Sequence, residues 1–79
     1  MHVHDILAAI PLDRRSGTPL FRQLYQPLKE AILAGDIGAG VRLPATRELG
    51  RLLRVSRQTV LAAYEQLTAE GYLQGAVGK

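Results

Sequence analysis

Four consecutive polar residues carry side chains that can read or grip a nucleic acid: Ser56, Arg57, Gln58 and Thr59. An arginine fork matches O6 and N7 of guanine, and a glutamine amide matches N6 and N7 of adenine. Serine and threonine hydroxyls suit a phosphate or a thymine methyl group. Because serine is also a good helix N-cap, Ser56 is expected to begin a helix whose unpaired N–H groups attract phosphate. Capping and solvation alone explain Ser56 and Thr59 equally simply, and for Ser56 we expect both roles.

Arginines are concentrated just before this helix start. Positions 42–57 hold five of them against one acidic residue, Glu48. They are Arg42, Arg47, Arg51, Arg54 and Arg57. The planar guanidinium suits phosphates and guanine edges. Taken alone, the cluster is explained as well by a solvated helix face, so it indicates only a preference for polyanions.

Two helices meeting at a tight corner would position these side chains. The first is expected over residues 46–53, with an apolar stripe of Leu49, Leu52 and Leu53. The second begins at Ser56, and its core face is expected to be Val60, Tyr64 and Leu67. Tyr64 is therefore interpreted as a core residue rather than as a base-stacking aromatic.

The corner itself needs a small residue and a residue that tolerates positive φ. Gly50 meets the first need, because it lets the two backbones approach closely. Arg54 stands where such turns usually have glycine. A left-handed Arg54 costs about 1 kcal/mol, which suggests either another turn geometry or a use for its side chain, such as a phosphate contact.

An earlier amphipathic helix is expected to begin with Thr18 as N-cap and Pro19 in the first helical position. Its buried face is expected to be Leu20, Leu24, Leu28, Ala31 and Ile32. Pro27 predicts a kink, and Gly35 is the stop signal.

The remaining segments predict an arm and a small sheet. Residues 1–17 form a leading arm with a short apolar turn at 6–10, and His2 and His4 near its start are expected to be disordered and are a poor metal signal. Residues 41–43 suit a very short strand, and residues 72–79 suit the first part of a hairpin that stops before its return strand. The expected fold is mainly α with a small β wing: a winged helix-turn-helix of three helices, one short strand and a hairpin.

Composition excludes several classes of protein. The 79 residues include no cysteine, so neither disulfides nor a cysteine-based zinc site is possible. No apolar run is long enough for a membrane span, and the N-terminus lacks a signal pattern, so a cytoplasmic location is expected. Paired carboxylates beside histidine, a Ser–His arrangement and a phosphate-binding glycine loop are all missing, so we expect no enzyme.

Residues 19–50 and 55–73 together resemble the N-terminal domain of the GntR superfamily of bacterial transcription factors. The segments PLFRQLY and AAYEQLTAEGYL are similar to its MocR subfamily, which includes PdxR-type regulators. The match spans about residues 18–79, and the combination of motifs is more specific than any one of them. The resemblance implies sequence-specific binding of a double-stranded DNA operator in a cytoplasmic, nucleoid-associated setting. It also implies homodimerisation through a C-terminal domain, similar to fold-type I aminotransferases and absent from this chain, that binds pyridoxal 5′-phosphate. No residue of this chain is assigned to that cofactor.

Transferred to this sequence, the family's DNA contacts fall on the second helix, the start of the third helix and the wing. The candidate DNA-binding residues are Arg42, Thr46, Arg47, Arg54, Ser56, Arg57, Gln58, Thr59, Gly78 and Lys79. Ala45 stands where a helix-capping serine is common, so that cap is lost or passes to Thr46, and Ala76 and Val77 make the wing less basic. The alternative function is a winged-helix module that contacts only proteins, against which stands the basic and polar start of the third helix.

Overall fold

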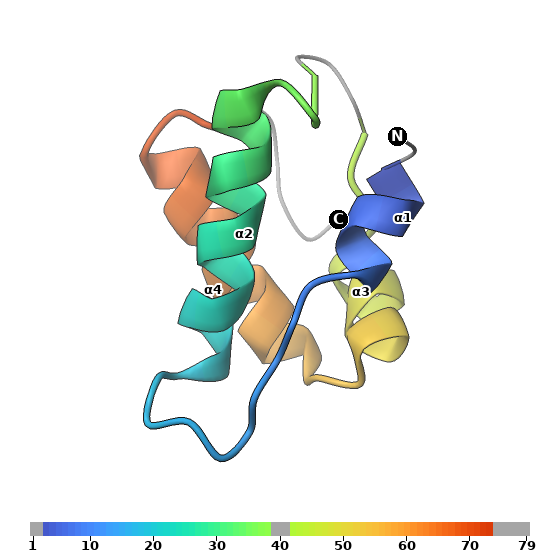
Figure 1. The fold of residues 1–79 in the computed structure, drawn as a ribbon, viewed down its shortest axis with the longest axis vertical. Helices are drawn as coiled ribbons and strands as arrows, with labels where there is room; N and C mark the ends of the chain where they lie inside the picture. Colours follow the sequence, from blue (N-terminus) through green and yellow to red (C-terminus); the bar gives the residue numbers. More distant parts are fainter. Residues whose placement is uncertain (1–2, 39–41, 74–79) are drawn as a thin grey trace.

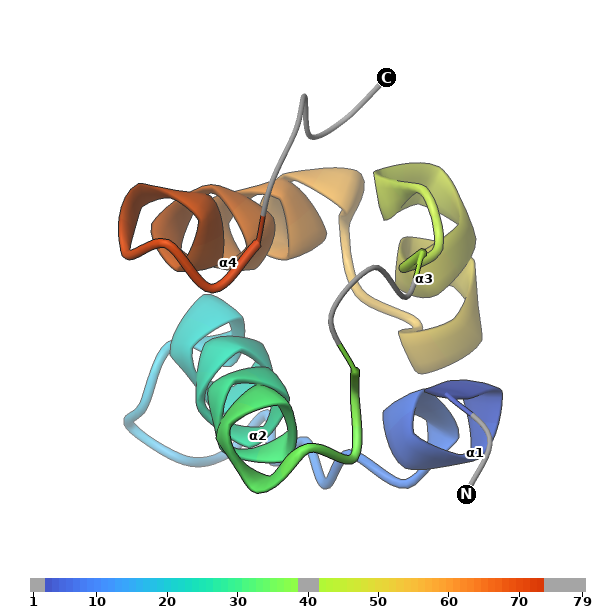
Figure 2. The ribbon, with the colours of Figure 1, turned by 90° about the horizontal axis from the view of Figure 1, so that it is seen from above.

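Four α-helices follow one another in the computed structural model, which describes residues 3–38 and 42–73 (Figure 1). They are α1 (Val3–Ala8), α2 (Leu20–Ala34), α3 (Thr46–Leu53) and α4 (Arg57–Ala69). Helix α4 packs against both α2 and α3. Seen from the side and from above, α1 lies next to α3 and α2 lies next to α4 (Figures 1 and 2). The described part of the chain is therefore mainly helical, as the sequence predicted.

The bounds of α2 differ from the prediction by one residue. Pro19 occupies the N-cap with extended angles, φ −57° and ψ 144°, and no side chain caps the helix, so the prediction of Thr18 as N-cap is wrong. The reason is that the carbonyl of Pro19 already accepts the N–H groups of Arg22 and Gln23, at 3.1 and 3.2 Å. The helix continues through Pro27 and ends at Gly35, whose φ of 84° confirms the predicted stop signal.

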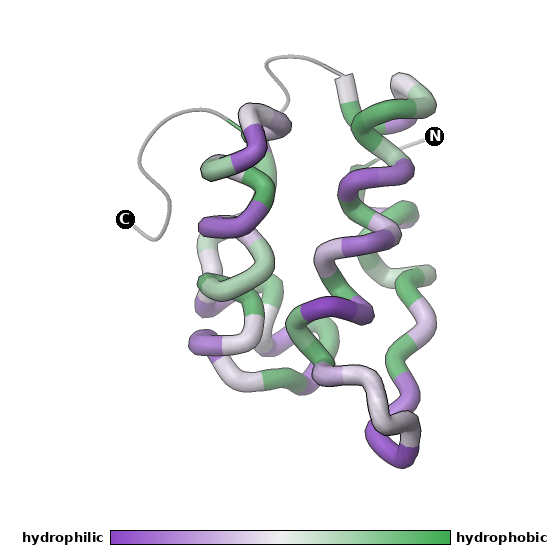
Figure 3. Tube along the Cα trace, turned by 90° about the vertical axis from the view of Figure 1, so that its left-hand side faces the viewer, coloured by the Kyte–Doolittle hydropathy of each residue, from purple (hydrophilic) through white to green (hydrophobic). Residues whose placement is uncertain are grey.

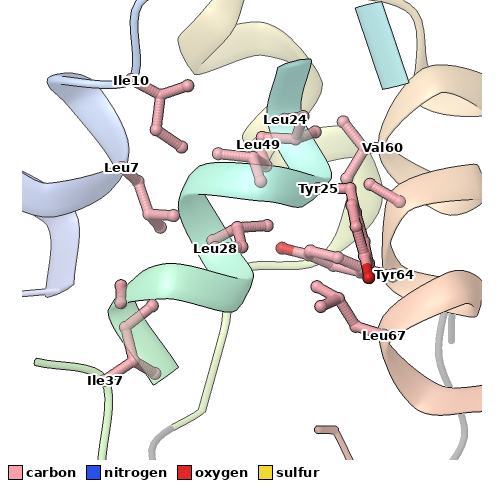
Figure 4. Close-up of a cluster of buried hydrophobic side chains, with 12 residues drawn as sticks. Leu7, Ile10, Leu24, Tyr25, Leu28, Ile37, Leu49, Val60, Tyr64 and Leu67 are labelled. Carbon is pink, nitrogen blue, oxygen red and sulfur yellow. The ribbon is translucent and has the colours of Figure 1, made fainter. Parts of the chain in front are cut away.

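One apolar core lies between the helices (Figure 4). Val60, Tyr64 and Leu67 are all buried, which confirms the predicted core face of α4. From α2 the core receives Leu24, Tyr25, Leu28 and Ala31, whereas Leu20 and Ile32 are only half-buried. Along the helices hydrophilic and hydrophobic residues are interleaved, as amphipathic helices around one core require (Figure 3).

Leu52 does not belong to the apolar stripe predicted for α3. It is 45% exposed, while Leu49 is fully buried and Leu53 is half-buried. The inner face of α3 is made by Leu49 together with Thr46 and Gly50, both of which are buried. Since each residue turns a helix by about 100°, Leu52 lies roughly 100° away from the centre of that face.

The N-terminal segment contributes to the core, which corrects the expected count of three helices. Residues 3–8 form α1, its Leu7 is fully buried, and Ile10 beyond its end is 8% exposed. Figure 4 shows both side chains on the side of the core away from Leu67. His4 lies within α1, so the expected disorder does not apply to it, whereas His2 lies outside the described residues. A six-residue helix has a weak periodic signal, and its burial comes from tertiary packing.

The β wing stays a prediction. Within residues 3–38 and 42–73 the chain forms no strand, and Arg42 and Leu43 are in irregular structure. Tyr72 and Leu73 lie in the turn after α4. Val41 and residues 74–79, which hold the rest of the expected strand and hairpin, lie outside the described residues.

Candidate nucleic-acid interface

Gly50 is the point of closest approach between α3 and the start of α4. A Cβ atom at this position would lie 3.0 Å from the carbonyl oxygen of Val55 and 3.6 Å from the amide nitrogen of Arg57. Both atoms belong to the backbone, which cannot move aside without changing the turn. The predicted role of Gly50 as the close-packing residue is confirmed.

The turn between the helices is closed by a left-handed residue, Arg54. Its φ of 57° and ψ of 44° confirm the strained conformation considered from the sequence, and it alone has positive φ among the non-glycine residues described. The N–H of Arg54 donates to the carbonyl of Arg51 at 3.4 Å, and the N–H of Val55 donates to that of Gly50 at 2.9 Å. This pair of bonds is a Schellman motif, which α4 also forms at its own end around Gly71.

Helix α4 begins with the capped, polar start that the sequence predicted. Ser56 has extended angles, and its Oγ accepts the N–H of Thr59 at 3.1 Å, so its role as N-cap is confirmed. The Oγ atoms of Ser56 and Thr59 are also 2.9 Å apart. Arg57 and Gln58 are exposed. The cap therefore engages Ser56 and Thr59, and the two longer side chains project from the first turn into solvent.

The other candidate residues divide by burial. Arg42, Arg47 and Arg54 are exposed, as is Arg51 in the last turn of α3. Thr46 is 5% exposed, so little of its side chain is accessible to a DNA backbone, and its predicted contact stays a prediction. The preceding Ala45 is the N-cap of α3 and provides no side-chain cap, so the expected cap is lost. Gly78 and Lys79 lie outside the described residues.

A tyrosine buried in α4 holds the segment that leads into α3. The hydroxyl of Tyr64 donates to the carbonyl of Pro44 at 2.8 Å, and the side chain is 4% exposed. Burial, and secondarily the nearby carboxylate of Glu48, raises the pKa of Tyr64 well above its usual range. The hydroxyl therefore stays neutral and remains a donor. Tyr64 is confirmed as a core residue, and the hydrogen bond adds a positioning role that the sequence did not indicate.

Sequence reasoning also missed an arginine outside the cluster. Arg14, in the loop between α1 and α2, donates a hydrogen bond from Nη2 to the carbonyl oxygen of Arg54. These residues are 40 positions apart. No spacing rule connects a loop arginine with a distant turn, so only the folded arrangement reveals the contact.

No helix in residues 3–38 and 42–73 combines the length and the apolar character that a membrane crossing requires. In the same residues, histidine and acidic side chains nowhere gather in a group of three or more that could hold a metal ion.

Known proteins resemble both the sequence and the fold. Residues 20–79 match the family model described as "Bacterial regulatory proteins, gntR family". The chain is 49% identical over 67 residues to the probable rhizopine catabolism regulatory protein MocR of Rhizobium meliloti, covering 85% of this chain and 14% of MocR. It is 37% identical over 75 residues to the pyridoxine biosynthesis transcriptional regulator PdxR of Corynebacterium glutamicum, covering 92% of this chain and 17% of PdxR. The chain thus spans a small part of these curated relatives.

A solved structure has the same fold. YtrA from Sulfolobus acidocaldarius, a GntR-family transcription factor, superposes with a TM-score of 0.80 at 35% sequence identity, covering 87% of this chain and 73% of that chain. The matched family and these relatives are transcription regulators rather than enzymes. The chain therefore belongs to the GntR family of bacterial regulatory proteins, and it has the helix-turn-helix domain of that family.

Proposed function

We propose that this chain binds a specific double-stranded DNA sequence by placing the start of α4 in the major groove. The observation that carries the proposal is the first turn of α4, where Ser56 caps the helix and Arg57 and Gln58 project into solvent. Helix-turn-helix proteins present the first residues of their second helix to base edges. The start of α4, capped by Ser56 and joined to α3 by a hydrogen-bonded turn, meets that requirement.

Base readout falls to Arg57 and Gln58. The guanidinium of Arg57 can donate two hydrogen bonds to O6 and N7 of a guanine, and the amide of Gln58 can pair with N6 and N7 of an adenine. Each such bidentate pair discriminates against a wrong base by about 1–3 kcal/mol. The operator is therefore expected to contain a guanine next to or near an adenine in each half-site.

Phosphate contacts surround the base readers. Ser56 and Thr59 stand at the helix start, where unpaired backbone N–H groups and the helix dipole favour an anion. Exposed Arg47 and Arg54 precede this start in the sequence, and exposed Arg42 lies further upstream. These contacts set the register of the protein on the duplex and give most of the affinity.

The wing contact is proposed from the family pattern. Gly78 and Lys79 fall where the wing of related proteins touches the DNA backbone or the minor groove. One lysine beside Ala76 and Val77 makes this a weak, sequence-independent contact.

The remainder of the proposed function concerns the whole regulator. We infer a cytoplasmic homodimer whose two helix-turn-helix units bind two half-sites of one operator. Similarity to MocR and PdxR supports a C-terminal, aminotransferase-like domain that binds pyridoxal 5′-phosphate and joins the protomers. None of the residues of this chain is assigned to the cofactor.

Selection of bound fragments from a random duplex library tests the proposal. The 79-residue chain is expected to enrich one short motif, weakly, because a single unit lacks the second half-site. Arg57→Ala should weaken binding to the selected motif by roughly 1–3 kcal/mol and relax the preference at one base position. Arg51→Ala, which removes an equal charge from the last turn of α3, is the matched control and should keep all base preferences. An unchanged motif with Arg57→Ala would contradict the placement of α4.

A further inference from the structure

The loop between α1 and α2 reaches the helix-turn-helix corner. In Figure 1 this loop runs through the lower part of the molecule, where the turn between α3 and α4 also lies. The contact is the hydrogen bond from Nη2 of Arg14 to the carbonyl of Arg54. Nothing in the proposed DNA contacts uses Arg14, so this bond needs its own explanation.

The turn has a physical need for such a partner. Arg54 is held at φ 57°, in the left-handed region that residues with a Cβ atom disfavour. The carbonyl groups at the end of α3 also form the negative end of its dipole, where a cation is favourable. The hydrogen bond from the guanidinium of Arg14 to the carbonyl of Arg54 therefore stabilises the left-handed conformation of Arg54.

The loop that carries Arg14 is itself fastened to α2. The side chain of Gln23 accepts the N–H of Asp13 at 2.7 Å and donates to the carbonyls of Asp13 and Thr18 at 3.0 and 2.7 Å. The carboxylate of Asp13 accepts the N–H of Arg15 at 2.9 Å. Arg14 thus extends from a closed loop anchored on a helix that packs against α4.

We propose that Arg14 is a positioning residue for DNA binding. By holding the carbonyl of Arg54 it keeps the turn left-handed, and so it sets the direction in which α4 leaves α3 and presents Arg57 and Gln58. Hydrogen bonds thus connect α2, through Gln23, to the loop between α1 and α2, and connect that loop, through Arg14, to the turn between α3 and α4. The part of this inference that concerns DNA rests on the proposed function, and the part that concerns the turn does not.

Hydrogen exchange of the Val55 amide measures the turn directly, because its N–H closes the motif onto Gly50 at 2.9 Å. Arg14→Gln should raise its exchange rate about 5-fold, which is the loss of one exposed charge-assisted hydrogen bond. Arg15→Gln removes an equal charge from the neighbouring position and should leave the rate within about 2-fold. Equal rates in the two variants would overturn the proposal. Helical circular dichroism and exchange of the buried α4 amides show whether each variant is folded; a folded Arg14→Gln chain with a protected Val55 also overturns it.

Replacing Arg54 by glycine tests the cause. Glycine adopts positive φ without strain, so the left-handed turn no longer depends on the hydrogen bond from Arg14. In the Arg54→Gly background, Arg14→Gln should change Val55 exchange by less than about 2-fold. An undiminished 5-fold effect in that background would show that Arg14 does not act through the conformation of residue 54.

DNA binding separates positioning from direct contact. On the selected duplex, Arg14→Gln should weaken binding roughly 5-fold more than Arg15→Gln, while both variants share the same dependence on salt. The salt dependence is the slope of the logarithm of the binding constant against the logarithm of salt concentration. If Arg14→Gln makes this slope shallower than Arg15→Gln does, by the amount of one phosphate contact, Arg14 contacts a phosphate and its positioning role is wrong. If the unmodified chain binds no duplex, the proposed function fails, whereas the exchange experiment still decides whether Arg14 holds the turn.

Discussion

Gly50 and Arg54 shape the corner in opposite ways. Gly50 is needed because the backbone of the turn leaves no room for a Cβ atom. Arg54 carries a full side chain at φ 57°, where glycine would be relaxed. One position is therefore already optimal for the fold, and the other keeps a strained residue whose side chain points to solvent. Substitutions at the two positions should change stability with opposite sign.

Gly50→Ala is expected to destabilise the domain. Alanine favours a helix by about 1 kcal/mol over glycine, but here its Cβ meets the carbonyl oxygen of Val55 at 3.0 Å. Overpacking against backbone costs roughly 1–3 kcal/mol, so we expect a net loss of about 1 kcal/mol in chemical denaturation. Gly17→Ala is the control, because no atom lies within 4 Å of its Cβ position. A Gly50→Ala chain as stable as the original would contradict the close-packing role.

Arg54→Gly is expected to stabilise the domain and to weaken its binding to DNA. Relief of the left-handed conformation should raise the free energy of unfolding by about 1 kcal/mol. Arg54→Ala separates the two effects, since it removes the guanidinium and keeps the strain. Thermal melting and anisotropy titration of both variants provide the comparison. The interpretation fails if alanine and glycine at position 54 melt at the same temperature.

Between the elements, a polar cluster joins the middle of α2 to the C-terminal end of α4. Tyr25 of α2 donates a hydrogen bond to the carboxylate of Glu70, just beyond α4, and Gln66 donates to the same carboxylate at 2.8 Å. Lys29 lies over the rings of Tyr25 and Tyr72, 5.8 and 5.6 Å from their centres. These contacts hold the chain as it leaves α4 toward the predicted wing.

The cluster predicts a pH dependence. The hydrogen bond from Tyr25, followed by that from Gln66, lowers the pKa of Glu70 below its usual range. A pKa lower in the folded than in the unfolded state means that Glu70 stabilises the fold above the unfolded pKa and loses this effect as pH falls through the folded one. The melting temperature of Glu70→Gln should therefore lie below that of the original chain at pH 7, with the difference shrinking below about pH 4. Glu65→Gln, an exposed change within α4, should show no such convergence.

Helices with clear periodicity could be predicted from the sequence, and contacts between distant segments could not. The core face of α4 and the Ser56 cap follow from local spacing and local hydrogen bonding, and both are confirmed. Leu52 was misassigned because α3 is only two turns long and several leucines fit its stripe. Helix α1, the bond between Tyr64 and Pro44, and that between Arg14 and Arg54 depend on tertiary packing, which a periodic pattern does not contain. The base contacts of Arg57 and Gln58 and the wing contacts of Gly78 and Lys79 stay predictions.

The net charge of the chain, +3, is modest, but five of its arginines are concentrated in residues 42–57. If each protomer neutralises about five phosphates, the logarithm of the binding constant should fall with the logarithm of salt concentration with a slope of roughly −4 to −5. Arg47→Ala should make the slope shallower by about 1 without altering base preference. Titration at several salt concentrations provides the slope, and a value near zero would favour the alternative of a protein-binding module.

Because Leu7 is buried, the folded domain includes residues that precede the segment matched by the family model. The family match begins at residue 20, yet Leu7 and Ile10, which precede it in the sequence, are buried in the core. Losing a buried leucine costs about 2–5 kcal/mol, a large share of the stability of a domain this small. The segment that matches the family model therefore depends for its stability on residues that precede it in the chain. A substitution at Leu7 should therefore change operator binding through the shape of the domain, without removing a contact to a base.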